Sequence, residues 1–269
     1  MRLAVCAAVL AAAAAASAEK PTPIPIARVA YVDGLVELKS GARPWARVAE
    51  GGELRIGDRL RTGEMGSARV DFPWMSVALS GGSVLAVSDS LVLATVLEAG
   101  RVEQSAPSGD LIKLIAGPAR IRGEGKVVVR RDGDATFVSA HAGRFRVESG
   151  GSVVTVSGGE GTIVKGKAAP QPTRPLAAAP TDLEPSDDPR YTLPNEPLTL
   201  RFRSTAAWHH VQILGIDSPQ PLIERDIQGT EVTLAIPWPG TFRWRVAARD
   251  RDGLEGLFSR EGLIAVVEK

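Results

Sequence analysis

Glycine spacing is the feature that most limits what this chain can fold into. Of the 28 glycines in 269 residues, 22 fall between residues 27 and 166, where they separate short runs rich in β-branched side chains. Apolar and polar residues alternate within these runs, as at Ala68, Val70 and Phe72, and no stretch sustains a 3.6-residue apolar period over three turns. Such runs predict short strands joined by tight turns. We therefore expect residues 27–164 to form an all-β domain, either a sandwich or a solenoid-like stack.

A second strand pattern follows residue 190. Leu198, Leu200 and Phe202 alternate with polar residues, and similar runs recur between turn signals such as Asp252-Gly253. The other apolar faces expected here are Val211/Ile213, Val232/Leu234/Ile236, Phe242/Trp244/Val246 and Leu263/Ala265/Val267. Short strands at this spacing, each with one apolar face, predict a small β-sandwich over residues 191–269.

Residues 165–190 differ from both flanking regions. They contain six prolines and two large aliphatic side chains, Leu176 and Leu183. Such a composition offers little apolar surface to bury, so it predicts a semi-extended linker that separates two domains.

The N-terminus has the three parts of a secretory signal peptide. Met1-Arg2 gives a positive start, residues 3–16 are apolar, and Ala16-Ser17-Ala18 is a small-x-small cleavage site. We expect residues 1–18 to be a signal peptide that is cleaved after Ala18, which makes the protein periplasmic or otherwise exported. The alternative is that this segment is retained as an anchor. No second apolar stretch of this length occurs, so no stable membrane span is expected after cleavage.

Charge and cysteine content limit the classes of partner and of chemistry that the sequence allows. Removing Arg2 with the signal peptide reduces 32 basic residues to 31, which balances the 31 acidic residues. A balanced chain lacks the excess of Lys and Arg that nucleic acid requires, so no nucleic-acid partner is expected. The one cysteine, Cys6, lies within the predicted signal peptide, which leaves the mature chain without disulfide or thiol chemistry.

One sequence stretch resembles a known family. It runs from Val32-Asp33-Gly34-Leu35-Val36 through Ile56-Gly57-Asp58-Arg59-Leu60-Arg61-Thr62-Gly63 to Gly81-Gly82-Ser83. The last three residues stand where the family has Asp-Gly-Ser, which is a mild departure at a turn. This order of motifs is similar to that of the FecR domain. Gly57, Asp58, Thr62 and Gly63 form its corner motif, which we interpret as a folding signature: glycine permits the bend and Asp58 can accept backbone N–H bonds within the turn.

The C-terminal region resembles fibronectin type III-like modules. The matching residues are Pro239-Gly240-Thr241-Phe242-Arg243-Trp244-Arg245-Val246, followed by Gly253-Leu254-Glu255-Gly256. Together the two resemblances imply a β-rich envelope protein used in sensing or interaction. Sigma regulators of the FecR family carry a sigma-binding region and a membrane helix ahead of the domain. A signal peptide stands in that place here, so that regulatory role is not expected.

The supply of catalytic and metal-binding groups is thin. Three histidines occur, His141, His209 and His210; the last two are adjacent, so on a strand they would face opposite sides and could not share a metal. We expect them on strand surfaces or turns. A calcium site at Asp250, Asp252 and Glu255 is conceivable, although it has few ligands. No metalloprotease, nucleophile-elbow or phosphate-loop motif is found. We expect no enzyme activity, no catalytic residues and no metal or other cofactor.

Tryptophans offer the best candidates for partner contact. Trp244 alternates with Phe242 and Val246 and should belong to the sandwich core, whereas Trp74, Trp208 and Trp238 could be exposed. The preferred function is a non-enzymatic exported envelope protein whose FecR-like domain acts in protein–protein interaction, sensing or scaffolding, with an envelope protein or cell-wall component as partner. The alternative is a carbohydrate- or peptidoglycan-binding accessory module of a wall-modifying system, which would need these tryptophans to form a platform.

Overall fold

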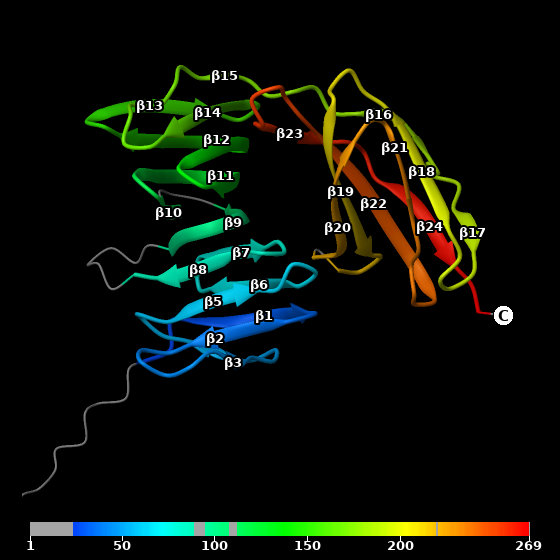
Figure 1. Cartoon of the computed structure of the whole chain (residues 1–269), viewed down its shortest axis with the longest axis horizontal. Coiled ribbons are helices and arrows are strands. Elements are labelled where there is room, and N and C mark those ends of the chain that lie inside the picture. Colours follow the sequence, from blue (N-terminus) through cyan, green and yellow to red (C-terminus); the bar gives the residue numbers. More distant parts are fainter. Residues whose placement is uncertain (1–23, 89–94, 108–111, 219, 269) are drawn as a thin grey trace, which may run out of the picture.

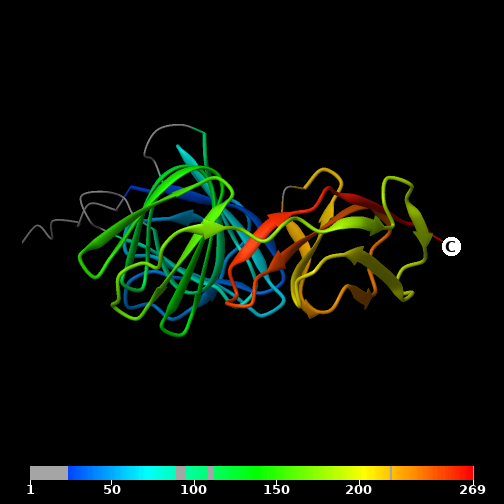
Figure 2. The same cartoon turned by 90° about the horizontal axis from the view of Figure 1, so that it is seen from above.

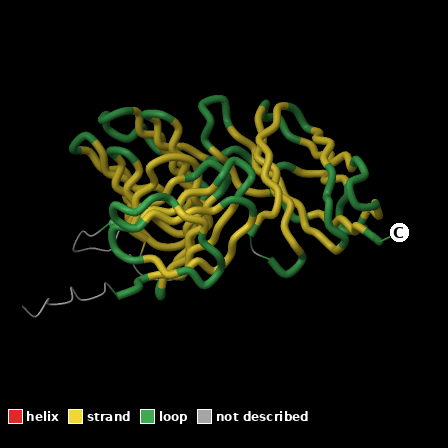
Figure 3. The backbone as a smooth tube through the Cα atoms, turned by 60° about the horizontal axis from the view of Figure 1, so that its bottom comes forward, coloured by secondary structure: helices red, strands yellow, loops and turns green. Residues whose placement is uncertain are grey.

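The structure, a computed structural model, describes residues 24–88, 95–107, 112–218 and 220–268. The predicted signal peptide, residues 1–18, lies outside them. The described residues form 24 strands and no helix, which confirms the all-β fold class (Figure 3). Accordingly, they include no helix that is long and apolar enough to cross a bilayer.

The first domain is a stack of strands that runs up one side of the molecule (Figure 1). Its strands within the described residues are β1 (Ala27–Asp33), β2 (Val36–Lys39), β3 (Ala46–Arg47), β4 (Glu53–Leu54), β5 (Arg59–Thr62), β6 (Ser67–Phe72), β7 (Met75–Leu79), β8 (Val84–Val87), β9 (Thr95–Ala106), β10 (Ile112–Ala116), β11 (Ala119–Asp132), β12 (Ala135–Ser149), β13 (Ser152–Ser157), β14 (Glu160–Lys165) and β15 (Arg174–Pro175). Hydrogen bonds join all of them into one sheet.

That sheet folds over into two walls. Wall A has the order β4, β1, β6, β7, the second half of β9, the second half of β11, the first half of β12, β14 and β15. Wall B has the order β3, β2, β5, β8, the first half of β9, β10, the first half of β11, the second half of β12 and β13. Three long strands, β9, β11 and β12, thus pass from one wall to the other. The two walls form a stack, the solenoid-like alternative among the two forms expected for this domain.

Glycines permit the three long strands to turn between the walls. Gly100 in β9, Gly125 in β11 and Gly143 in β12 have φ values of 84°, 104° and 84°, a region that other residues rarely adopt. Gly125 and Gly143 are partners in the β11–β12 ladder. A Cβ on either would lie within 3 Å of the backbone of the other strand. The glycine spacing therefore marks the corners of the stack as well as its turns.

The core of the first domain lies between the walls. The alternating residues Ala68, Val70 and Phe72 point inward and are buried, as expected from the sequence. At the corner motif, Gly57 has φ +86° and Asp58 Oδ2 accepts a bond from the Arg55 amide at 2.8 Å. The Thr62 hydroxyl donates to the Ser80 carbonyl at 2.7 Å. Gly63 packs closely against Leu35, where a Cβ would lie 3.1 Å from the Leu35 Cβ. These four residues hold the bend together through backbone conformation, hydrogen bonds and close packing.

The second domain is a two-sheet sandwich beside the stack (Figure 1). One sheet contains β16 (Thr181–Glu184), β18 (Leu198–Arg203) and β21 (Glu231–Leu234). The other contains β17 (Arg190–Thr192), β24 (Gly262–Val266), β22 (Gly240–Arg249), β19 (Trp208–Gly215), β20 (Pro221–Gln228) and β23 (Glu255–Phe258). Trp244, Phe242 and Val246 are buried between them, as predicted, and the Trp244 indole donates to the Pro185 carbonyl at 2.8 Å.

The last strand has the opposite face to the one expected. Ile264 and Val266 are buried, whereas Val267 is 40% exposed and Leu263 and Ala265 are half-buried. Five consecutive apolar residues, 263–267, give no polar alternation from which to choose between the two faces of a strand. Tertiary pairing with β22 decides it.

The segment predicted as a linker, residues 165–190, is built into both domains. Its β15 pairs with β14 of the first domain, and its β16 pairs with β18 of the second. Arg174 binds Asp250 at 2.8 Å and Asp252 at 2.9 Å. The segment buries little apolar surface, as its composition indicates, but open strand edges and ion pairs order it instead.

Candidate functional site at the domain interface

The outer surface of wall A packs against the outer surface of the larger sheet of the second domain. Looking down the stack, Figure 2 shows the second domain attached along one side of the first. Along β9, Val102, Gln104 and Ala106 are buried on the core side, so Arg101 and Glu103 point outward. Along β19, Val211 and Ile213 belong to the sandwich core, so His210 and Gln212 point toward the first domain. Strand alternation in both domains therefore places charged residues in the interface.

Arg101 and Glu255 form the centre of this interface. The guanidinium donates two bonds to the carboxylate, from Nε at 3.1 Å and from Nη2 at 2.7 Å, and a third from Nη1 to the Ser80 hydroxyl at 3.0 Å. Arg101 is 5% exposed and Glu255 is 2% exposed. Burial alone would raise the pKa of Glu255, but the charges of Arg101, His210 and Arg249 and the hydrogen bond from Arg101 together outweigh it and lower that pKa. Burial alone would lower the pKa of Arg101, but the nearby carboxylates, of which Glu255 has the largest effect, outweigh burial and raise that pKa.

His210 bridges two carboxylates of β20. Its Nδ1 lies 2.7 Å from Asp226 Oδ1, and its Nε2 lies 3.1 Å from Glu224 Oε1. Both ring nitrogens can donate at once only in the protonated imidazole. Burial and Arg101 lower the pKa of His210, whereas Glu255 and the hydrogen bonds to Asp226 and Glu224 raise it above its ordinary value. The geometry thus favours the charged histidine.

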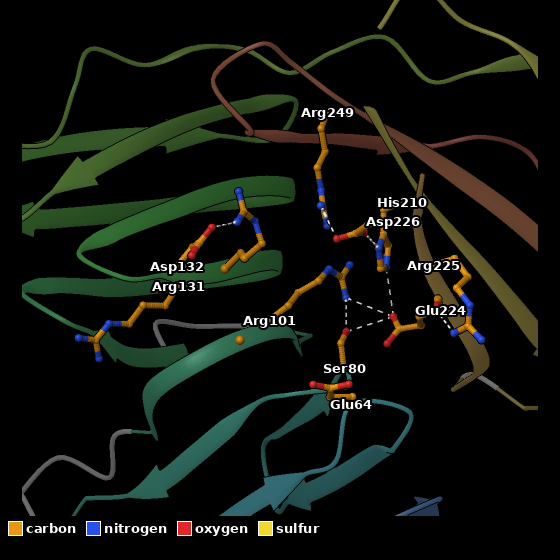
Figure 4. Close-up of a pocket in the computed structure, with 13 residues that line it drawn as sticks. Glu64, Ser80, Arg101, Arg131, Asp132, His210, Glu224, Arg225, Asp226 and Arg249 are labelled. Atoms are coloured by element: carbon orange, nitrogen blue, oxygen red, sulfur yellow. Dashed lines mark hydrogen bonds and ion pairs between the residues drawn. The ribbon is translucent and has the colours of Figure 1, made fainter. Parts of the chain in front are cut away.

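Arg249 closes the arrangement into a ring. Its Nη1 binds Asp226 at 2.6 Å and its Nη2 lies 3.6 Å from Glu255. Glu224 Oε1 lies 3.8 Å from Arg101 Nη1. Positive and negative groups therefore alternate around what we call the ion-pair ring: Arg101, Glu255, Arg249, Asp226, His210 and Glu224. Figure 4 draws the side chains of this ring apart from Glu255. The charges of the ring balance when His210 is protonated.

The ring lowers the pKa of both β20 carboxylates. Burial would raise the pKa of Glu224, but the hydrogen bond and charge of His210, followed by Arg101, lower it to about 2. The pKa of Asp226 is lowered to about 2 in the same way, with Arg249 in place of Arg101. A cavity of about 370 Å³ lies beside the ring, lined also by Glu64, Arg131 and Arg225 (Figure 4).

The hydrogen bonds and ion pairs of the ring bind its charged side chains to one another. A general base needs a free lone pair within reach of a substrate, but each ring nitrogen of His210 faces a carboxylate and each carboxylate of the ring faces a cation. Further contacts run along the interface, from the Ser67 hydroxyl to the Pro221 carbonyl at 3.1 Å and from Arg130 to the Gly253 carbonyl at 3.0 Å. The ring therefore acts as a polar lock between the domains.

The histidines are more buried than expected. His209 and His210 point to opposite sides of β19, as predicted, but both are buried rather than on a strand surface. His209 packs edge-on against Phe202 in the sandwich core, with 4.7 Å between ring centroids. His141 is half-buried and contacts Phe258 edge-on at 6.0 Å. Burial lowers the pKa of His141 and of His209.

The three carboxylates considered for calcium have other partners. Asp250 and Asp252 bind Arg174, and Glu255 binds Arg101. In the described ranges, no group of three or more His, Cys, Asp or Glu residues is arranged to hold a metal ion. These acids therefore join the domains through arginine.

The three candidate tryptophans do not meet in one platform. Trp208 and Trp238 are 49% and 45% exposed, but Trp208 pairs with Arg249 at one end of β22 and Trp238 precedes Gly240 at the other end. Nine residues of strand separate those ends by roughly 30 Å. Trp74 belongs to the first domain, where it packs against the core.

Sequence reasoning missed four of the six residues of the ring; Glu255 and His210 were considered, but only for metal binding. A weak signal was present: His210 and Gln212 alternate on one strand and Glu224 and Asp226 on the next, opposite an apolar face. Charged residues on the polar face of a sandwich strand ordinarily indicate contact with water.

Comparison with known proteins gives limited matches. No family model and no curated protein matches the chain. Among solved structures, it is similar to two crystal structures of a candidate anti-sigma factor from Parabacteroides distasonis. One has 17% identity and a TM-score of 0.39, the other 16% and 0.38, and each match covers 44% of this chain. The chain spans 59% of the length of that protein in both cases.

Proposed function

We propose that this protein is a non-enzymatic, exported envelope protein in which a FecR-like domain and a fibronectin type III-like domain act as one body in protein–protein interaction, sensing or scaffolding. The observation that carries the proposal is the ion-pair ring, because the buried charged side chains that form it join the two domains to each other. The corner motif at Gly57 and Asp58 and the order of the strands in the two sheets around Trp244 support the two resemblances. The N-terminal sequence supports export.

We place the partner contact at the end of the second domain where Trp238 lies. Gly240 pairs with Val266, and the Val267 amide donates to the Thr192 carbonyl at 2.9 Å, so three neighbouring strand ends meet there. Trp238, Val267 and Tyr191 are 45%, 40% and 70% exposed. Exposed aromatic and aliphatic side chains on adjacent strands form the kind of surface that protein partners bury.

In vivo photo-crosslinking tests this proposal. A photoreactive phenylalanine analogue replaces Trp238 in one variant and Trp208 in a matched control, since both side chains are about equally exposed. We expect a discrete crosslinked species in the envelope fraction from position 238 and none from position 208. Equal crosslinking at both positions, or recovery of the protein in the cytoplasm, would contradict the proposal.

A further inference from the structure

A second cleft opens where the domains meet near the β6–β7 turn. It has a volume of about 670 Å³ and is lined by residues of β6, β7, β9 and β11 and by Gln220, which precedes β20 of the second domain. Small-molecule sites usually measure 300–1,000 Å³ and often lie at domain interfaces. The cleft is complete only when both domains are in place.

An aromatic pair forms one side of the cleft. Trp74 is half-buried, and its ring centroid lies 6.1 Å from that of Phe72 at an interplanar angle of 41°. Phe72 is buried in the core, so it supports Trp74 from behind while part of the indole remains open. Supported, partly exposed tryptophans bind flat apolar surfaces at low cost in conformational entropy.

Gln220 supplies an unmet hydrogen-bond acceptor. The residue is 4% exposed, yet its Oε1 has no hydrogen-bond partner within the part of the chain that the structure describes. Buried side-chain polar atoms are nearly always paired, so this oxygen is left to accept a hydrogen bond from outside the described residues. Gln220 is one of the residues that line the cleft, so a ligand bound there would lie beside this side chain.

The charged residues of the cleft neutralise one another. Lys126 Nζ lies 2.8 Å from Glu103 Oε1, and Arg69 Nε lies 3.1 Å from Asp71 Oδ1. Ser76 and Ser105 add hydroxyl groups. With both charge pairs satisfied, the cleft has no surplus charge with which to select an anion or a cation.

We propose that this cleft binds a neutral oligosaccharide. A pyranose ring has an apolar C–H face that fits the Trp74 indole and a rim of hydroxyl groups that can donate to Gln220 Oε1. Hydroxyl groups also pair with the serines and with the outer lone pairs of Glu103 and Asp71. This site is separate from the Trp238 surface, so its failure would leave the proposed partner contact intact.

Titration of the mature protein with defined tetrasaccharides tests the proposal. Calorimetry and tryptophan fluorescence are used with cellotetraose, maltotetraose and chitotetraose as neutral probes and tetragalacturonate as an anionic one. We expect at least one neutral probe to bind with a Kd of about 1 mM or tighter, and tetragalacturonate to bind at least about tenfold more weakly.

Variants locate the binding. Trp74→Ala should weaken the best probe by at least about tenfold, and Gln220→Met, which keeps the side-chain length without the acceptor, by about threefold or more. Trp208→Ala, an exposed tryptophan outside the cleft, should leave the affinity unchanged. Thermal melts identify any variant that has lost its fold, and for such a variant Trp74→Phe is titrated instead. The proposal is overturned if no neutral probe binds, if tetragalacturonate binds best, or if the cleft variants bind like wild type.

Discussion

Replacing Glu255 with glutamine removes one charge from the ion-pair ring while keeping the size of the side chain. Arg101 would then remain 5% exposed without its two bonds to a carboxylate. Removing one partner of a buried ion pair costs about 3–5 kcal/mol. Glu224 and Glu103, each 3.8 Å from the guanidinium, retain part of the attraction, so we expect the lower value, about 3 kcal/mol.

Thermal unfolding followed by circular dichroism measures this loss. For a chain of this size, each kcal/mol lowers Tm by about 2–4 °C, which gives a fall of about 6–12 °C. Glu231→Gln is the matched control, because Glu231 pairs with Arg201 at 2.9 Å but both side chains are more than half exposed. An exposed pair contributes about 0.2–1 kcal/mol, so this variant should melt within a few degrees of wild type.

A double-mutant cycle tests whether the effect belongs to the pair. With Arg101→Met added to Glu255→Gln, the uncompensated charge is gone, so the double variant should be more stable than the sum of the two single losses predicts. If Glu255→Gln melts like Glu231→Gln, or if the two losses simply add, the ring does not lock the domains and the reasoning is wrong.

Three further predictions concern pH, the sandwich core and export. The pKa values of Glu224 and Asp226 are lowered to about 2, so their contribution to stability is lost as pH falls from about 4.5 toward 2; that of His210 is raised, so its contribution is lost as pH rises above 6.5. Tm should therefore peak between these limits, and His210→Gln should flatten the alkaline side of the profile. Trp244→Ala should cost about 3–5 kcal/mol because the indole is fully buried, whereas Trp238→Ala should change stability by no more than about 0.5 kcal/mol; denaturant melts in the reverse order would show that the strand faces are misassigned. Intact mass of the protein from its native host should correspond to residues 19–269, and a mass that includes residues 1–18 would favour a retained anchor.

Local patterns predict the strands of this protein well. Alternation at Ala68, Val70 and Phe72 identifies the inward face of β6, because one buried side fixes which residues are apolar. The same logic fails at β24, where consecutive apolar residues remove the contrast between faces. It also fails for residues 165–190, which are ordered by backbone bonds to strand edges that no composition reveals.

The interface between the domains could not be predicted from the sequence for a different reason. Arg101 and Glu255 are 154 positions apart, and nothing near either residue indicates the other. Each looks like an ordinary solvated charge until the domains are placed together. The pairing is a property of the tertiary arrangement, so the candidate site could not be assembled from the sequence alone.

The contacts of the second domain with wall A extend along much of the stack. They begin at Ser67 on β6, pass through Arg101 on β9 and Arg130 on β11, and reach Gly161 on β14, where the absent side chain leaves room for Leu254. Five strand spacings of about 4.8 Å separate β6 from β14, roughly 24 Å in all. The second domain therefore braces wall A, because its contacts connect strands from β6 to β14. A force applied to the far end of the second domain would be distributed over all of these contacts.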